Sequence, residues 1–136
     1  PTEVSSPASI ALMDALARHI GCVRVRQVSC SQHDAIIAYT SDLMHIASAG
    51  LCIHFHPDMD QSFTAGAFRD CTRIADINAT AWTGLLLENR QNVLTCLGVY
   101  IEDLGRIKAA IEGGDAAALA ELLESAGRNK REMLTR

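Results

Sequence analysis

The stretch NATAWTGLLLENRQNVLTCLGVYIEDLGRIKAAIE, residues 78–112, decides the fold of this chain. Asn78 is a favourable N-cap, and apolar side chains follow it at steps of three and four residues, as on one face of a helix. The stripe consists of Trp82, Leu86, Asn89, Val93, Leu97, Tyr100, Leu104, Ile107 and Ile111. A helix over these residues would be roughly 45 Å long, more than so small a domain needs for its own core. We therefore expect part of the stripe to contact another subunit.

Further helices are expected on both sides of this stretch. Gly113-Gly114 ends the long helix, and Asp115 caps a last helix that runs from residue 116 to about residue 131. Residues 35–50 are rich in Ala, Ile, Leu and Met, which predicts a helix of about four turns. A short helical segment is expected over 68–76, and a loop over 54–62. The fold class is mainly α, a helical bundle.

The amino-terminal residues have a different pattern. Ser5-Ser6-Pro7 supplies a cap and a first-turn proline for a short helix that Gly21 ends. Residues 22–28 alternate in character, which predicts one strand. Because a lone strand has no pairing partner, this helix-strand unit resembles the last piece of a larger α/β sheet. We therefore divide the chain into residues 1–28, the remnant of a preceding domain, and residues 29–136, a helical domain.

Composition excludes several classes of function. The chain has 136 residues, 49% of them hydrophobic and 21% charged, which predicts an ordered soluble domain. A net charge of -4 without a basic patch argues against nucleic-acid binding. The longest uncharged stretch, residues 43–57, is too short to span a membrane, and no signal peptide is recognisable, so we expect a cytoplasmic protein. The five cysteines form no Cys-x-x-Cys pair and are interpreted as free thiols.

The first group of candidate site residues is His33-Asp34 with Ser41 and His45. Their spacing places His33, Ser41 and His45 near one side of a helix, where they would line a shared pocket. The alternative is that His33 caps the helix and His45 is a hydrogen-bonded core histidine.

His54, His56 and Asp58 are a separate set of potential metal ligands. A solvated loop is the better interpretation of these residues, so no metal site is predicted.

The second group lies in residues 66–75, GAFRDCTRIA. Asp70 and Arg73 are one helical turn apart, so they can form an ion pair while Arg73 keeps donors free. A guanidinium matches a carboxylate with two parallel hydrogen bonds, which suits a dicarboxylic substrate. The alternative is a solvated ion pair of little energetic weight. Gly66 would permit close approach to the backbone.

Taken together, these residues resemble the prephenate dehydrogenase family, over about residues 29 to 131. Members of that family carry His-Asp, then Ser-His-Leu-Pro-His, then Gly-Gly-Phe-Arg-Asp-x-Thr-Arg-Ile-Ala, then a tryptophan and Asn-Arg. The corresponding segments here are His33-Asp34, Ser41-Asp42-Leu43-Met44-His45, residues 66–75, Trp82 and Asn89-Arg90. A match of several motifs in order is far more specific than any one of them.

The resemblance implies a fold and an activity. The helical domain would be a dimerisation domain like the C-terminal domain of 6-phosphogluconate dehydrogenase, and residues 1–28 would end a nucleotide-binding domain. The enzyme would use NAD or NADP to decarboxylate prephenate oxidatively to 4-hydroxyphenylpyruvate in tyrosine biosynthesis, with tyrosine as a possible effector. No Gly-x-Gly-x-x-Gly motif is present, so we expect this chain to bind no cofactor and to be inactive alone. The alternatives are an arogenate dehydrogenase domain and a non-catalytic module for dimerisation or ligand sensing.

The resemblance also implies residue roles. Arg73 would bind a substrate carboxylate, Asp70 would orient that arginine, and His45 with Ser41 would line the pocket. Gly66 and Trp82 would reach the site from the partner subunit of a homodimer, and His33 would lie near it. Two residues depart from the family pattern, since Asp42 and Met44 replace a histidine and a proline. An acid at residue 42 would repel a dicarboxylate, which puts the identity of the ligand in doubt.

Overall fold

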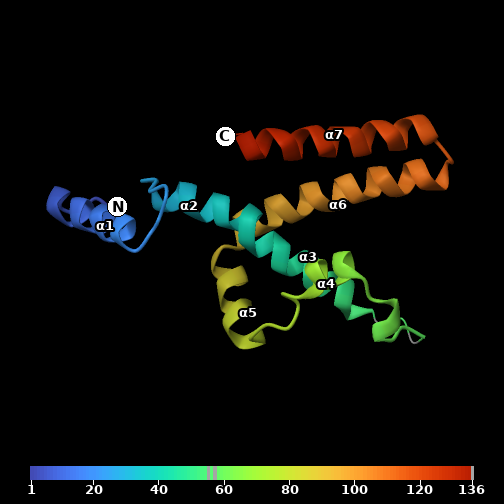
Figure 1. Ribbon diagram of the computed structural model, residues 1–136, viewed down its shortest axis with the longest axis horizontal. Helices are drawn as coiled ribbons and strands as arrows, with labels where there is room; N and C mark the ends of the chain where they lie inside the picture. Colours follow the sequence, from blue (N-terminus) through green and yellow to red (C-terminus); the bar gives the residue numbers. More distant parts are fainter. Residues whose placement is uncertain (55, 57, 136) are drawn as a thin grey trace. The chain divides into compact units, whose positions relative to one another are not determined.

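A computed structural model describes residues 1–54, 56 and 58–135 (Figure 1). All regular elements within these residues are helical, which confirms the predicted fold class. The chain divides into two compact units, residues 1–93 and 94–136, and each is described separately. The first unit contains the candidate site.

Helix α1, Pro7–His19, begins as the sequence predicts. The Ser6 side chain accepts a hydrogen bond from the backbone N–H of Ser9, and a proline occupies the first turn. Gly21, with a φ of 98°, follows the helix end. On the exposed face, the hydrogen-bonded Arg18 guanidinium holds the pKa of the Asp14 carboxyl below its usual value.

The predicted strand over residues 22–28 is not formed. These residues are irregular, and no strand is present in the described part of the chain to pair with them. An isolated strand leaves its backbone groups without a ladder partner, so alternation of side chains alone does not make one. The proposed boundary between residues 28 and 29 stays a prediction.

A continuous helical segment covers Cys30–Ile53, longer than predicted. It consists of α2, Cys30–Ile37, the π-helical turn η1, Ala38–Asp42, and α3, Leu43–Ile53. Ser29 and Gln32 form a reciprocal capping box at its start, so Ser29, and not His33, is the cap. Its buried side chains include Ala38, Asp42, Leu43 and Ser48, which form most of the small core of the first unit.

By length and composition, this segment could cross a membrane. The uncharged stretch of residues 43–57 covers only part of this segment, because Asp34 and Asp42 lie within it, and a helix can carry an occasional charge among apolar residues. A core helix of a soluble protein has the same properties, so the absence of a membrane-spanning segment stays a prediction.

Short helices complete the first unit. They are the 3-10 helix η2, Gln61–Phe63, α4, Gly66–Thr72, and α5, Ala79–Glu88. Helix α4, which is shorter and begins earlier than the predicted 68–76, packs against α3. The predicted loop over 54–62 includes Phe55 and Pro57, which lie outside the described residues, and η2 begins within it. Asn78 caps α5 as predicted, through the backbone N–H of Ala81.

The single long helix predicted from Asn78 is wrong, because the structure divides it at Asn89. Helix α5 ends at Glu88, and α6, Arg90–Glu112, begins immediately afterwards. Asn89 has a φ of -93° and a ψ of 18°, and its side chain bonds to another helix. Asparagine favours helix ends because its side chain competes for backbone partners. The sequence has no glycine or proline at this point, and the helical spacing of apolar residues continues through Asn89, so the sequence alone predicted one helix.

The second unit is a helical hairpin. Figure 1 shows the part of α6 that belongs to this unit, residues 94–112, beside α7, Ala116–Thr135. Gly114, with a φ of 62°, makes the turn, and Asp115 caps α7 by accepting from the backbone N–H of Ala118, as predicted. Ala110 is buried in the hairpin, whereas a stripe on another face of α6 is exposed. This exposed stripe consists of Leu94, Ile101, Leu104 and Ile111.

Candidate functional site

The centre of the candidate site is the contact between His45 and Trp82. The centroids of the two rings are 3.7 Å apart at an interplanar angle of 40°. Both side chains are half-buried. Helix α3 supplies the histidine and α5 the tryptophan. We expected Trp82 to reach the pocket from a partner subunit, but its ring lies against His45 of its own chain.

A hydrogen bond links His45 to the segment that follows α4. His45 Nδ1 lies 3.2 Å from the backbone oxygen of Ile74. A carbonyl oxygen can only accept, so Nδ1 carries the proton and donates. In the neutral ring, Nε2 is then an acceptor for a ligand hydroxyl or a water. The bond also brings Arg73, the residue before Ile74, into the neighbourhood of His45.

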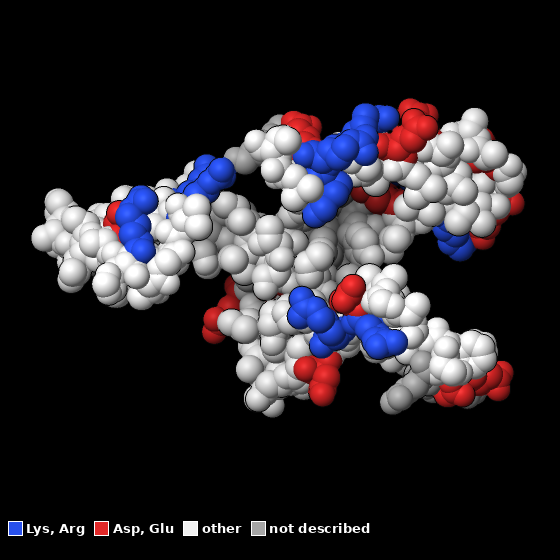
Figure 2. Space-filling model, viewed as in Figure 1, with Lys and Arg blue, Asp and Glu red and all other residues white. Residues whose placement is uncertain are grey.

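Arg73 is the exposed C-cap residue of α4. No ion pair joins it to Asp70 within the described residues, although one helical turn separates them. Arg69 instead donates to the backbone oxygen of Thr64 at 3.0 Å. Figure 2 shows basic and acidic side chains together over α4, where Arg69, Asp70 and Arg73 are exposed. The guanidinium of Arg73 is therefore accessible to a carboxylate from solution.

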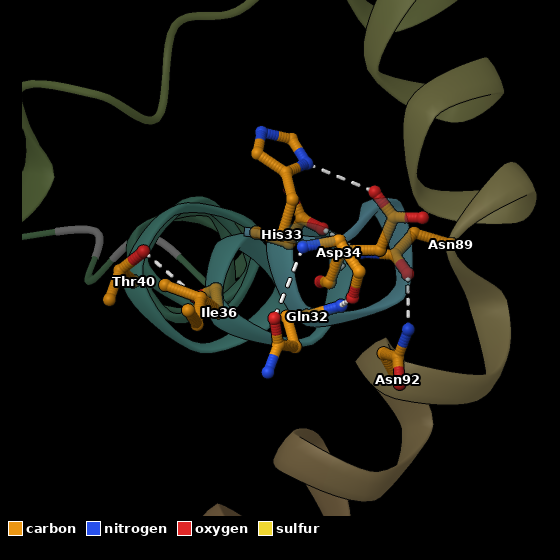
Figure 3. Close-up of polar contacts among 9 residues, drawn as sticks. Gln32, His33, Asp34, Ile36, Thr40, Asn89 and Asn92 are labelled. Carbon is orange, nitrogen blue, oxygen red and sulfur yellow. Dashed lines mark hydrogen bonds and ion pairs between the residues drawn. The ribbon is translucent and has the colours of Figure 1, made fainter. Parts of the chain in front are cut away.

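Asn89, the C-cap residue of α5, makes polar contacts with the helical segment of residues 30–53 (Figure 3). Its amide nitrogen donates to the backbone oxygen of Asp34 in α2 at 2.9 Å and to Asp42 Oδ2 in η1 at 3.1 Å. Its amide oxygen accepts from Asn92 at 2.8 Å. Asp42 is 5% exposed, so an amide donor partly compensates the cost of burying its carboxylate. The acid that departs from the family pattern is thus bonded within the chain.

The structure does not bring the other predicted site residues together. His33 donates from Nδ1 to the carboxylate of the adjacent Asp34 at 3.0 Å, and both side chains are exposed. No contact joins His33 to His45 among the described residues. The π-helical turn between them holds an extra residue, which rotates the helix register and separates the positions that regular spacing would align.

Ser41 and Gly66 make no hydrogen bond to His45 or Trp82 within the part of the chain that the structure describes. Ser41 is half-buried in the π-helical turn. Gly66 is the first residue of α4, and a Cβ placed there would meet no atom of this chain within 4 Å. Its small size is therefore not required by packing within the chain, although a ligand or a second subunit can still approach it. No cluster of metal-ligating side chains occurs among the described residues.

Sequence reasoning identified Asp42 and Asn89 only as positions within motifs. Their interaction joins residues 47 positions apart, so local spacing could not predict it. The available signal was an acid within an apolar helix together with an asparagine within an apolar stripe. Each of these is costly to bury alone, and mutual pairing removes part of that cost.

Comparison with known proteins assigns the chain to a family. Residues 29–125 match the model of the prephenate dehydrogenase dimerization domain. Among curated relatives, prephenate dehydrogenase of Bacillus subtilis is 30% identical over 74% of this chain and 28% of its own length. Cyclohexadienyl dehydrogenase of Zymomonas mobilis is 31% identical over 72% of this chain and 36% of its own length. The chain therefore spans about a third of these relatives.

Solved structures show the same relationship. Prephenate dehydrogenase from A. aeolicus, crystallised with hydroxyphenyl propionate and NAD+, is 25% identical, with a TM-score of 0.80 over 98% of this chain and 48% of its own. Synechocystis arogenate dehydrogenase, at 23% identity, shares the fold with a TM-score of 0.78 over 98% of this chain and 50% of its own. These relatives are oxidoreductases, and this chain corresponds to only part of them. The chain belongs to the prephenate dehydrogenase family and matches its helical C-terminal dimerization domain.

Proposed function

We propose that this chain is the substrate-holding and subunit-pairing part of a cytoplasmic enzyme that oxidatively decarboxylates prephenate, or the related arogenate, with NAD or NADP. The observation that carries the proposal is the hydrogen bond from His45 to Ile74, together with the match of residues 29–125 to the family. That bond brings two motifs, separated by 29 residues in sequence, to one place. One motif supplies an imidazole and the other a guanidinium.

The proposed roles follow from the chemistry of these groups. Arg73 binds a substrate carboxylate, because its exposed guanidinium offers paired donors. His45 accepts from a substrate hydroxyl through Nε2, and the indole of Trp82 provides an apolar wall beside the ring. Ser41, Gly66 and His33 are assigned to the periphery of the pocket. Asp70 orients Arg73 once a ligand is bound.

The cofactor is assigned to the rest of the enzyme. A dinucleotide site requires a strand, a glycine turn and a helix, and the described residues contain no such unit. We therefore assign none of the residues of this chain to hydride transfer. When bound, the nicotinamide would accept the hydride. Tyrosine as an effector is likewise proposed from the family alone.

The proposed dimer uses the exposed stripe of α6. Leu94, Ile101, Leu104 and Ile111 repeat at steps of three and seven residues, which places them on one side of the helix. Their exposed fractions lie between 46% and 61%. A second copy of the chain that covers this stripe would remove these side chains from water, which is the main driving force for association.

Arg73→Ala tests the proposal in the protein joined to its cofactor domain. Two charge-assisted hydrogen bonds to the substrate carboxylate would be lost, about 3 kcal/mol together, so we expect KM for prephenate to rise by roughly 100-fold. Arg106→Ala is the matched control, because Arg106 is exposed and belongs to the second unit. An unchanged KM in Arg73→Ala would exclude the carboxylate-binding role. Parallel assays with arogenate decide between the two substrates.

A further inference from the structure

Among the described residues, two contacts between side chains join α5 and its C-cap residue Asn89 to the helical segment of residues 30–53. One is the ring contact between His45 and Trp82, and the other is the bond between Asp42 and Asn89. Asp42 lies three residues before His45, and Asn89 lies seven residues after Trp82. Residues at these spacings share a face of a helix, so the two contacts belong to one seam.

The two contacts constrain the seam in different ways. An aromatic contact between half-buried rings tolerates sliding and tilting, since dispersion depends weakly on orientation. A hydrogen bond to a buried carboxylate requires a defined distance and angle. Asn89 donates both amide hydrogens across the seam, to Asp42 and to the backbone of Asp34, and the bond from Asn92 holds its amide in that orientation.

We propose that Asp42 is a positioning residue, which acts through Asn89 to hold α5 where Trp82 contacts His45. Asp42 is 5% exposed and its carboxylate accepts from Asn89, so it fixes the position of α5 and is not a ligand for substrate. The inference rests on the proposed function only in treating His45 as a pocket residue. The repulsion of a dicarboxylate that the sequence suggested is thereby reduced, because the amide dipole of Asn89 faces the acid.

The emission of Trp82 measures the contact directly, because it is the single tryptophan of the chain. The wavelength of its emission maximum and its quenching by added acrylamide both depend on how far the indole is exposed to water, so they report the contact without any substrate. His45→Ala removes the contacting ring and gives the reference values for a chain without the contact.

Four variants of the chain test the positioning role. Asp42→Ala should shift the emission to longer wavelength and increase quenching by acrylamide toward the values of His45→Ala, whereas Asp42→Asn, which keeps an oxygen acceptor, should retain the wild-type values. Asn89→Ala removes the donor and should behave like Asp42→Ala, which keeps the test valid where Asp42→Ala does not fold. Asp103→Ala removes an exposed acid of the second unit and should match the wild type.

Two results would overturn the inference. The first is wild-type emission and acrylamide quenching in Asp42→Ala or Asn89→Ala with native circular dichroism, since the contact would then form without the hydrogen bond. The second is emission of Asp42→Asn like that of His45→Ala, because an oxygen acceptor at residue 42 would then be insufficient. Neither result bears on whether Arg73 binds substrate, so the proposed function is tested independently.

Discussion

Replacement of Asn89 by alanine should destabilise the first unit more than a substitution at a helix end usually does. The change removes one hydrogen bond to a buried carboxylate, worth about 1.5–3 kcal/mol, and one to a backbone carbonyl, worth about 0.5–1.5 kcal/mol. Asn89 is half-buried, so water can partly replace its amide. We therefore expect the free energy of unfolding to fall by about 2–3 kcal/mol.

Urea denaturation followed by far-UV circular dichroism measures this change, at one protein concentration because dimerisation makes stability concentration-dependent. Asn92→Ala is the matched control. It removes a single neutral bond to Asn89 and should cost about 1 kcal/mol. A loss in Asn89→Ala no larger than that in Asn92→Ala would refute the reasoning, because the bonds across the seam would then contribute nothing beyond local capping.

Three further predictions concern packing, backbone conformation and assembly. Leu43→Ala should lower the free energy of unfolding by about 2–5 kcal/mol in the same urea assay, because Leu43 is 3% exposed. Gly114→Ala should lower the melting temperature, at a cost of about 1–2 kcal/mol, because its φ of 62° disfavours a side chain; thermal melts measure this change. Ile101→Glu should shift the chain from dimer to monomer in sedimentation, and Val99→Glu, equally exposed but on the other side of α6, should leave the dimer intact; dissociation by both would contradict the assigned face.

Features that depend on local chemistry were predictable from the sequence. Ser6, Asn78 and Asp115 cap the helices as expected, because an N-cap needs only a side-chain oxygen and a nearby backbone N–H. The turn at Gly113-Gly114 follows in the same way, since Gly114 adopts a positive φ.

Features that depend on distant partners were not predictable. The side chain of Asn89, where the helix breaks, donates to acceptors 47 and 55 residues away, on Asp42 and Asp34. The spacing of apolar residues around Asn89 does not indicate these partners. The π-helical turn at residues 38–42 changes the register between His33 and His45, so the predicted common face was not formed. The contact of His45 with Trp82 of the same chain was not predictable either, since helical spacing has no information on contacts between helices and the resemblance implied a tryptophan from the partner subunit.

The distribution of apolar side chains connects fold and assembly. Among the described residues, the buried hydrophobic core consists of Ala38, Leu43, Val93 and Ala110, whereas many large hydrophobic side chains are exposed. A chain of this length ordinarily buries well over half of the surface that it exposes when unfolded. So small a core cannot offset the conformational entropy of ordering the helices, because that entropy amounts to about 1–2 kcal/mol per residue for the backbone alone. We infer that covering the α6 stripe by a second subunit contributes to the folding of the hairpin itself, so unfolding and dissociation should occur together.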